Sequence, residues 1–267
     1  MKGNIVKVLI SSVIMLAFCS CTQKVKTEQK TNTIAPTTQT KKTQASKNVK
    51  KAAPDFVRIT DDNVVEELTK YGEHNRETKV RISTSMGDMI IKLYDNTPLH
   101  RANFVRLVKE KFYDGTEFYR VINNFMIQGG DTDDWERRAV KNRMGKYTLP
   151  PEFKTDNIHK RGAVSMVREY ENNPEQRSSA YEFFIVQGEK YTDGQLNGAE
   201  YAYDIKINQQ HRAIYKQIGG CVHLDGKHTV FGEVVDGLDV IDKIAAVKTD
   251  DGDWPIEAVK MVVEVIE

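Results

Sequence analysis

Short stretches of alternating polar and apolar residues, separated by turn signals, recur from residue 78 to residue 266 and constrain the fold more than any other feature. The segment TKVRISTSMGDMIIKLYD, residues 78–95, alternates on both sides of Met86-Gly87-Asp88, which predicts a hairpin. Further strands are predicted at residues 116–121, 125–128, 163–166, 183–187, 229–235 and 259–266.

Helical signals are fewer. Residues 61–72 start with acidic residues, carry apolar residues at helical spacing and reach Gly72, a typical stop. Thr97 is an N-cap candidate, and Pro98 suits the first turn of the helix that follows. A second core helix is predicted at residues 238–247. Many strands with only two core helices favour a mainly β fold, a closed antiparallel barrel whose ends the helices cap.

The N-terminus has the layout of an export signal, assigned to residues 1–21. Its apolar run, residues 8–18, is too short to span a bilayer. Ser20 before Cys21 resembles the lipobox of bacterial lipoproteins, in which the cysteine becomes the lipidated first residue; Cys19 is the other candidate. We therefore expect a lipid anchor that holds the protein to an envelope membrane, facing the periplasm. A cleaved form, secreted or at the cell surface, is the alternative.

Residues 22–54 are rich in Lys, Thr and Gln and predict a flexible linker. Residues 1–53 carry ten lysines and one glutamate, a net charge of +9, against +1 for the whole chain, so the remainder carries about −8. A folded part that acidic is a poor nucleic-acid binder. Cys221 is the only thiol beyond the N-terminal segment, which excludes an internal disulfide there.

Motifs for phosphate, dinucleotide or metal binding are lacking. Cys221, His223 and His228 lie close in sequence but have no second ligand pair, so no metal site is predicted.

One stretch, FYRVINNFMIQGGD at residues 118–131, places Arg120 among apolar side chains of a predicted hairpin. It is followed in order by RGAVSMVR, EFFIVQG and LDGKHTVFGEVVDGLDVIDKI. This series resembles the cyclophilin family of peptidyl-prolyl cis-trans isomerases, from about residue 79 to residue 267. The resemblance implies an eight-stranded closed antiparallel barrel at residues 78–267. The helical pattern at residues 61–72 predicts a short helical extension before it, at residues 55–77.

The resemblance also implies which residues act. Arg120 matches the catalytic arginine of the family, and no cofactor is required. The substrate-binding positions that it implies are Phe125, Met126, Gln128, Val167, Arg168, Glu182, Phe184, Leu224 and His228. Among them, four apolar side chains match the walls that hold the proline ring: Phe125, Met126, Phe184 and Leu224.

An arginine suits this chemistry on physical grounds. Rotation about an X-Pro bond faces a barrier of about 18–20 kcal/mol because the nitrogen shares its lone pair with the carbonyl. A donor aimed at that nitrogen localises the lone pair and weakens the partial double bond. Arginine stays charged at any relevant pH and presents several fixed N–H groups. The contact helps only if it is stronger in the twisted state than in the planar one.

Several positions depart from the family pattern. Glu182 stands where the family has a glutamine. If its carboxylate came within about 4 Å of Arg120, the two groups would attract each other by about 4 kcal/mol. This attraction could hold the guanidinium away from the substrate or orient it correctly. Val167 and Arg168 replace the usual alanine and asparagine, whose role is largely backbone contact with substrate. His223 replaces the tryptophan of the cyclosporin-binding eukaryotic relatives, which predicts weak inhibition by that drug.

Two segments have no clear counterpart in the family. The loop after Asp131 is charged where many relatives are glycine-rich, which leaves open the specificity for the residue two before proline. The insertion at residues 191–220 predicts a helix, with Asn208 as N-cap and Gly219 as C-cap. This helix either flanks the substrate groove or packs on the outside of the barrel.

The sequence therefore predicts a monomeric, membrane-tethered isomerase that assists folding of exported proteins by binding their proline-containing segments. The main alternative is a chaperone or interaction module that binds proline segments with little or no turnover. Glu182 and Val167 are the residues that favour this alternative.

Overall fold

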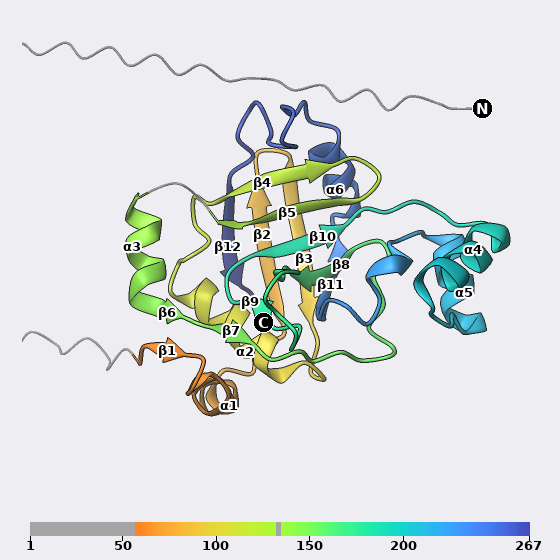
Figure 1. Cartoon of the computed structure of the whole chain (residues 1–267). Coiled ribbons are helices and arrows are strands. Elements are labelled where there is room, and N and C mark those ends of the chain that lie inside the picture. The colour runs from red at the N-terminus through yellow and green to blue at the C-terminus, as the bar shows by residue number, and fades with distance from the viewer. Residues whose placement is uncertain (1–56, 132–134) are drawn as a thin grey trace, which may run out of the picture. The chain divides into compact units, whose positions relative to one another are not determined.

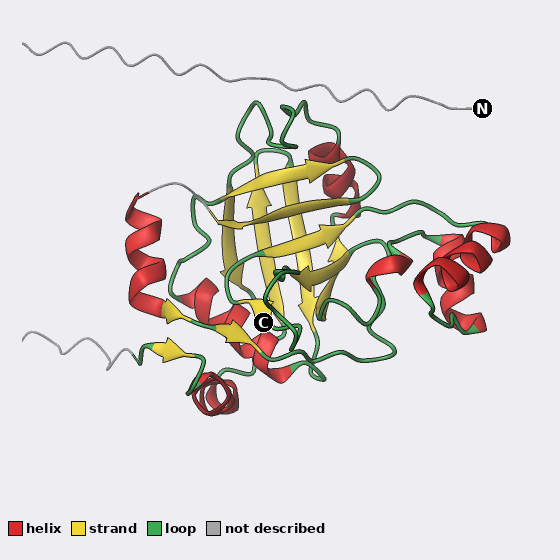
Figure 2. Ribbon diagram, in the orientation of Figure 1, coloured by secondary structure: helices red, strands yellow, loops and turns green. Residues whose placement is uncertain are grey.

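The computed structural model describes residues 57–131 and 135–267. The predicted signal peptide, the linker and the lipidation candidate Cys21 lie outside these ranges. Eight strands form one antiparallel sheet in the order β12-β2-β3-β11-β8-β10-β5-β4 (Figures 1 and 2). They are β2 (Lys79–Thr84), β3 (Gly87–Leu93), β4 (Glu117–Ile122), β5 (Met126–Asp131), β8 (Ala163–Met166), β10 (Phe183–Val186), β11 (Val230–Asp236) and β12 (Met261–Val265). All eight correspond to predicted strands.

The two edges of this sheet meet at one place. The Phe118 N–H of β4 donates to the Val259 carbonyl, and the Met261 N–H of β12 donates to the Thr116 carbonyl. An isolated antiparallel bridge joins Glu117 to Lys260 between them. The curled eight-stranded sheet is thus confirmed, whereas closure along the whole length of the edge strands stays a prediction.

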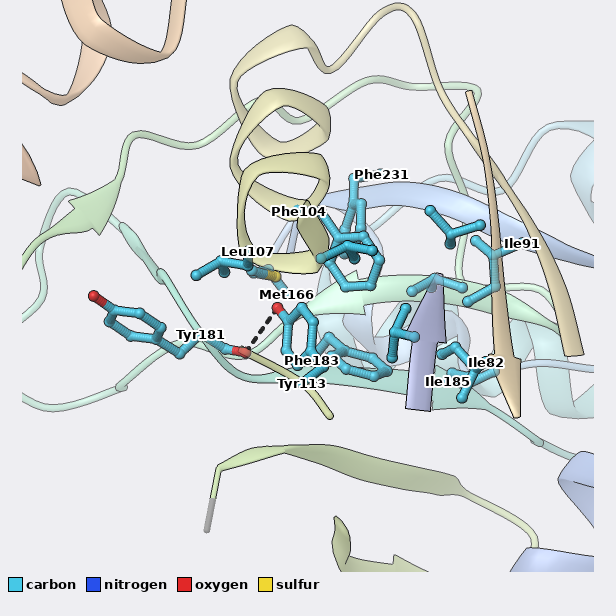
Figure 3. Close-up of a cluster of buried hydrophobic side chains, with 14 of the residues drawn as sticks. Ile82, Ile91, Phe104, Leu107, Tyr113, Met166, Tyr181, Phe183, Ile185 and Phe231 are labelled. Atoms are coloured by element: carbon cyan, nitrogen blue, oxygen red, sulfur yellow. Dashed lines mark hydrogen bonds between the residues drawn. The ribbon is translucent and has the colours of Figure 1, made fainter. Parts of the chain in front are cut away.

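The core lies inside the curled sheet and is rich in aromatic rings (Figure 3). Phe104, Tyr113, Phe183 and Phe231 are fully buried. The Phe104 ring lies 5.5 Å from Phe183 and 5.2 Å from Phe231, and the Phe183 contact is edge-on. Such pairs stabilise a fold beyond the area they bury. The folded domain therefore holds together by packing.

Helix α2 (Pro98–Lys109) and helix α6 (Leu238–Ala245) are the two predicted core helices. Thr97 occupies the N-cap position, but its side chain makes no capping hydrogen bond. The carboxylate of Glu152 accepts from the first backbone N–H groups of α2 instead, those of Leu99 (3.1 Å) and His100 (2.9 Å). A distant carboxylate does the capping because a helix N-terminus favours negative charge.

The N-terminal extension is part of this packed structure. Helix α1 (Val64–His74) buries Val64 and Leu68 in the main core and packs against α2. Gly72 does not stop it, because the helix continues for two residues before Asn75. Strand β1 (Ile59–Thr60) pairs in parallel with β6 (Gly145–Lys146).

The charged segment after Asp131, expected to be a loop, contains helix α3 (Trp135–Met144). Its sequence has a low apolar content, so periodicity gave no helical signal. Two further short strands follow, β7 (Thr148–Leu149) and β9 (Ser178–Ser179), which pair antiparallel.

The insertion contains two helices, α4 (Asp193–Tyr203) and α5 (Gln209–Gln217), and leads into a 3-10 turn, η1 (Val222–Leu224). Asn208 caps α5 as predicted, by accepting from the His211 N–H. Gly219 follows the C-cap residue with φ of +86°, a conformation that glycine adopts readily. Helix α4 was not predicted. In the part of the chain that the structure describes, no helix is long and apolar enough to cross a membrane.

Candidate active site

A cavity of about 280 Å3, which we call the Arg120 cavity, opens beside β4, β5 and β10. All the positions that the sequence assigned to catalysis and substrate binding lie on its walls. They are Arg120, Phe125, Met126, Gln128, Val167, Arg168, Glu182, Phe184, Leu224 and His228. Glu169 and Tyr170 complete the lining and were not predicted.

Strand alternation explains how the apolar floor of the cavity arises. Phe183 and Phe184 are neighbours on β10 and point to opposite faces of the sheet. Phe183 enters the main core, whereas Phe184 joins a second buried cluster with Met126 and Leu224. The His159 ring stacks on Phe184 at 6.0 Å. The floor of the cavity is therefore apolar, and the His159 ring packs against it.

Arg120 lies on β4, opposite Gln128 of β5. Its side chain is 45% exposed, and its Nε lies 3.4 Å from Oδ2 of Asp253. The terminal nitrogens of this guanidinium have no protein partner among the described residues. Arg120 thus reaches the cavity with donors available for a ligand.

Glu182 does not pair with Arg120. Its carboxylate accepts from the Tyr119 hydroxyl at 2.8 Å and from the Ser179 hydroxyl at 2.9 Å. The Gln128 amide donates to the same Tyr119 oxygen. Burial, reinforced by the Glu182 carboxylate, raises the pKa of Tyr119 well above its usual value, so the hydroxyl stays protonated. Glu182 is therefore held by two hydroxyl donors, and among the described residues the carboxylate that pairs with Arg120 is that of Asp253.

His228 is buried on the cavity wall. Its Nδ1 lies 3.1 Å from the Met166 carbonyl and its Nε2 lies 2.7 Å from the Tyr170 hydroxyl. Burial lowers the pKa of His228 to about 4, and nearby His159 and Arg168 act in the same direction. A neutral ring with Nδ1–H facing a carbonyl leaves Nε2 as an acceptor for Tyr170.

Val167 and Arg168, which follow β8, differ in their backbone hydrogen bonds. The Val167 N–H donates to the Glu182 carbonyl at 3.0 Å, and the Val167 carbonyl accepts from the Ser179 N–H at 2.7 Å. The backbone N–H and carbonyl of Arg168 have no such partners among the described residues. Arg168, unlike Val167, therefore keeps backbone groups at the cavity that pair with no described residue. Its side chain donates to the Lys227 carbonyl and lies over the Tyr170 ring, 4.4 Å from the centroid.

The other residues singled out from the sequence, Cys221 and His223, lie shortly before Leu224 in the chain. His223 stacks on Phe125 with ring centroids 5.6 Å apart, and burial lowers its pKa. Cys221 is buried, and burial raises the pKa of its thiol to about 12. Within the described ranges, no three potential ligands gather in a geometry that could hold a metal ion.

A larger cavity of about 580 Å3 adjoins the first and shares Val167, Glu169 and Glu182 with it. Residues from the segment after Asp131 line it, including Lys141 and Tyr147. The charged segment after Asp131 therefore borders a space next to the Arg120 cavity. This is the segment that left open the specificity for the residue two before proline.

Three residues of the candidate site were not predicted, because no local pattern in the sequence marks them. Glu169 and Tyr170 belong to a stretch after β8 without periodicity. Asp253 lies in the segment between α6 and β12, far along the chain from Arg120.

Comparisons with known proteins identify the family of the chain. Residues 79–265 match the family described as cyclophilin type peptidyl-prolyl cis-trans isomerase/CLD. A protein of Staphylococcus haemolyticus named a peptidyl-prolyl cis-trans isomerase is 33% identical over 198 residues, which cover 72% of this chain and 95% of that protein. A bifunctional phosphatase/peptidyl-prolyl cis-trans isomerase of Streptococcus pyogenes is 37% identical over 205 residues, 73% of this chain but only 39% of that longer protein.

Among solved structures, a cyclophilin of Cryptosporidium parvum superposes with a TM-score of 0.50 at 21% identity, over 71% of this chain and 99% of that one. This likeness supports the fold. The family match and the relative of similar length go further, and with the cavity they lead to one conclusion: the chain belongs to the cyclophilin-type peptidyl-prolyl cis-trans isomerases (EC 5.2.1.8).

Proposed function

We propose that this protein isomerises X-Pro bonds by hydrogen bonding from the Arg120 guanidinium to the prolyl nitrogen. The observation that carries the proposal is the composition of one cavity. An apolar floor of Met126, Phe184 and Leu224 lies within the same space as the Arg120 side chain. The floor suits a pyrrolidine ring, and the guanidinium supplies the donor that the twisted state needs.

The arrangement favours the twisted state over the planar one. In the planar amide the nitrogen lone pair is delocalised and accepts poorly, whereas twisting localises it. A hydrogen bond that involves a charged donor contributes about 1.5–3 kcal/mol, and each 1.36 kcal/mol of selective stabilisation is about a factor of ten in rate. Asp253 holds only Nε of Arg120, which leaves the terminal nitrogens for this contact. No proton transfer is needed.

Two further groups would hold the substrate backbone. The N–H and carbonyl of Arg168 face no protein partner among the described residues and can pair with an extended peptide. Gln128 donates its amide N–H to Tyr119, which fixes the amide plane and leaves its oxygen for a peptide N–H. Both lie on the walls of the Arg120 cavity.

The setting that we propose is the cell envelope. The export signal at residues 1–21 and the candidate Cys21 support a lipid anchor, and the Lys-rich linker gives the domain reach from the membrane. The clients would then be proline-containing segments of exported proteins. Metabolic labelling with a palmitate analogue, compared between wild type and Cys21→Ala, tests the anchor; labelling that persists in Cys21→Ala but not in Cys19→Ala would move it to Cys19.

The test of the enzymatic proposal is the cis-to-trans rate of an Ala-Pro peptide, measured in a protease-coupled assay with the full chain and its Arg120→Ala variant. We expect acceleration by wild type and a loss of about 100-fold or more in kcat/KM for Arg120→Ala. Equal rates for the two proteins would remove the arginine mechanism. Peptide binding without acceleration by wild type would establish the alternative, a proline-binding chaperone.

A further inference from the structure

A row of three aromatic rings, Phe125, His223 and Tyr203, joins the Arg120 cavity to the insertion. Phe125 lines the cavity and stacks on His223 at 5.6 Å with ring planes 30° apart. His223 in turn lies 5.8 Å from Tyr203, at the C-terminal end of α4. The row therefore continues the apolar surface of the cavity onto α4.

The outer end of this row is open to solvent. Tyr203 is 45% exposed, and Phe125 and His223 are both partly exposed. Burial lowers the pKa of His223, so its ring is neutral at pH 7 and stacks without the cost of desolvating a charge. Exposed aromatic rings that continue a binding pocket are typical anchors for a partner chain.

The row is held in place by the insertion's own packing. Leu196 of α4, Tyr215 of α5 and Val222 of η1 share a separate buried cluster. The Tyr215 hydroxyl donates to Asp225 at 2.6 Å, and Asp225 also accepts from the His159 backbone. Because these contacts fix α4 beside η1, little ordering is needed when a ligand binds.

We propose that the aromatic row is an extension of the substrate groove that selects peptides with an aromatic side chain within three residues of the proline. This inference rests on the proposed function, since the peptide must occupy the Arg120 cavity as well. An aromatic side chain fits because stacked and edge-on rings attract each other beyond their buried area. The Lys227 ammonium lies over the Tyr203 ring, 5.1 Å from the centroid, which disfavours a basic side chain at this place.

The test uses the full chain and peptides with one Ala-Pro unit, in which Phe, Ser or Lys occupies each of the three positions on either side. Turnover and binding are measured for wild type, Tyr203→Ala, Tyr203→Phe and Tyr201→Ala. Tyr201 is the matched control, because it lies on the same helix, is 93% exposed and makes no ring contact within the described residues. Thermal unfolding of each variant checks that α4 remains folded.

We expect wild type to bind the best Phe peptide about three- to tenfold more tightly than its Ser counterpart, and the Lys peptide more weakly than either. Tyr203→Ala should abolish this preference, whereas Tyr203→Phe and Tyr201→Ala should keep it. Equal binding of Phe and Ser peptides, or equal loss in Tyr203→Ala and Tyr201→Ala, would overturn the proposal.

The two proposals fail in different ways. Turnover without any dependence on Tyr203 would retain the isomerase and reject the aromatic groove. Binding that depends on Tyr203, without turnover of any peptide, would retain the groove and reject the arginine mechanism.

Discussion

Two carboxylates border the site from different regions, and they relate to Arg120 in different ways. Glu182 precedes β10, within the motif that suggested the family, and its carboxylate is held by the Tyr119 and Ser179 hydroxyls. Asp253 lies outside every such motif, in the segment between α6 and β12, and its carboxylate pairs with Nε of Arg120. A departure inside a motif therefore need not alter the proposed catalytic group, whereas a residue far along the chain can pair with it.

The difference arises from how the two regions are anchored. The Asp253 carbonyl accepts from the Val121 N–H at 2.8 Å, and the Trp254 ring packs on Tyr119 at 5.5 Å. Three consecutive residues of β4 thus contact this one segment, including Arg120 through Asp253. Among the described residues, Glu182 makes no ion pair with the Arg120 guanidinium. Its carboxylate accepts from the Tyr119 hydroxyl instead.

The largest expected effect on stability comes from His228, on the cavity wall. Its pKa is about 4 when folded, below the ordinary value of 6.5, so the unfolded chain binds the proton first as pH falls. Stability should therefore be lost between about pH 6.5 and pH 4, by about 3 kcal/mol from this group. Urea unfolding across this range, for wild type and His228→Asn, measures it.

The His228→Asn variant keeps every carboxylate, so the difference between the two pH profiles isolates the histidine. Asn can also bond to the Met166 carbonyl and the Tyr170 hydroxyl. Parallel profiles would show that His228 is not the buried neutral group described above.

The next effect should come from Asp253→Asn, which keeps the shape of the side chain and removes its charge. We expect kcat to fall about tenfold with KM nearly unchanged, because the guanidinium loses its fixed orientation but the apolar floor is intact. Stability should change by less than about 1 kcal/mol, since the ion pair is half-exposed. Asp253→Glu should recover part of the activity; a kcat equal to wild type in Asp253→Asn would show that the pair is incidental.

Removing the Tyr119 hydroxyl should have a smaller effect, on binding. In Tyr119→Phe the Gln128 amide loses its fixed partner, and Glu182 loses one of its two donors. We expect KM for an Ala-Pro peptide to rise about threefold and kcat to stay constant. Steady-state kinetics would detect this change. A fall in kcat instead would mean that Glu182, once released, reaches Arg120.

Glu182→Gln should have the smallest effect, less than about twofold in kcat/KM. A glutamine oxygen can still accept from the Tyr119 or Ser179 hydroxyl, and Arg120 has its carboxylate partner elsewhere. The same kinetic assay measures it, with slow reaction of the buried Cys221 thiol as a check that the fold is intact. A large gain in rate would show that Glu182 damps wild-type turnover after all.

The strands and the cavity lining could be predicted because their signals are local or belong to an ordered motif series. Alternation located the strands, and the register between Phe184 and Gln128 brings both to one cavity. Helix α3 could not be predicted, since its polar sequence has no apolar stripe. The capping of α2 by Glu152 is likewise a contact between residues far apart in the chain.

The same reason accounts for what was missed at the site. Glu182 stands out in the sequence because it departs from a motif, but no local pattern indicates that the Tyr119 hydroxyl would donate to it. No sequence motif points to Asp253, because its pairing with Arg120 depends on how the segment before β12 folds back over β4. The position of the insertion could not be predicted either, because it depends on the contact between Tyr203 and His223.

The central claim is that Arg120 acts on the twisted peptide bond and not on binding alone. The most direct measurement is the cis–trans exchange rate of an Ala-Pro peptide while it is bound, obtained by NMR exchange spectroscopy on wild type and Arg120→Ala at equal occupancy. The account predicts a dissociation constant within about threefold of wild type and exchange at least about 100-fold slower in Arg120→Ala. Equal exchange rates in the two bound complexes would contradict it.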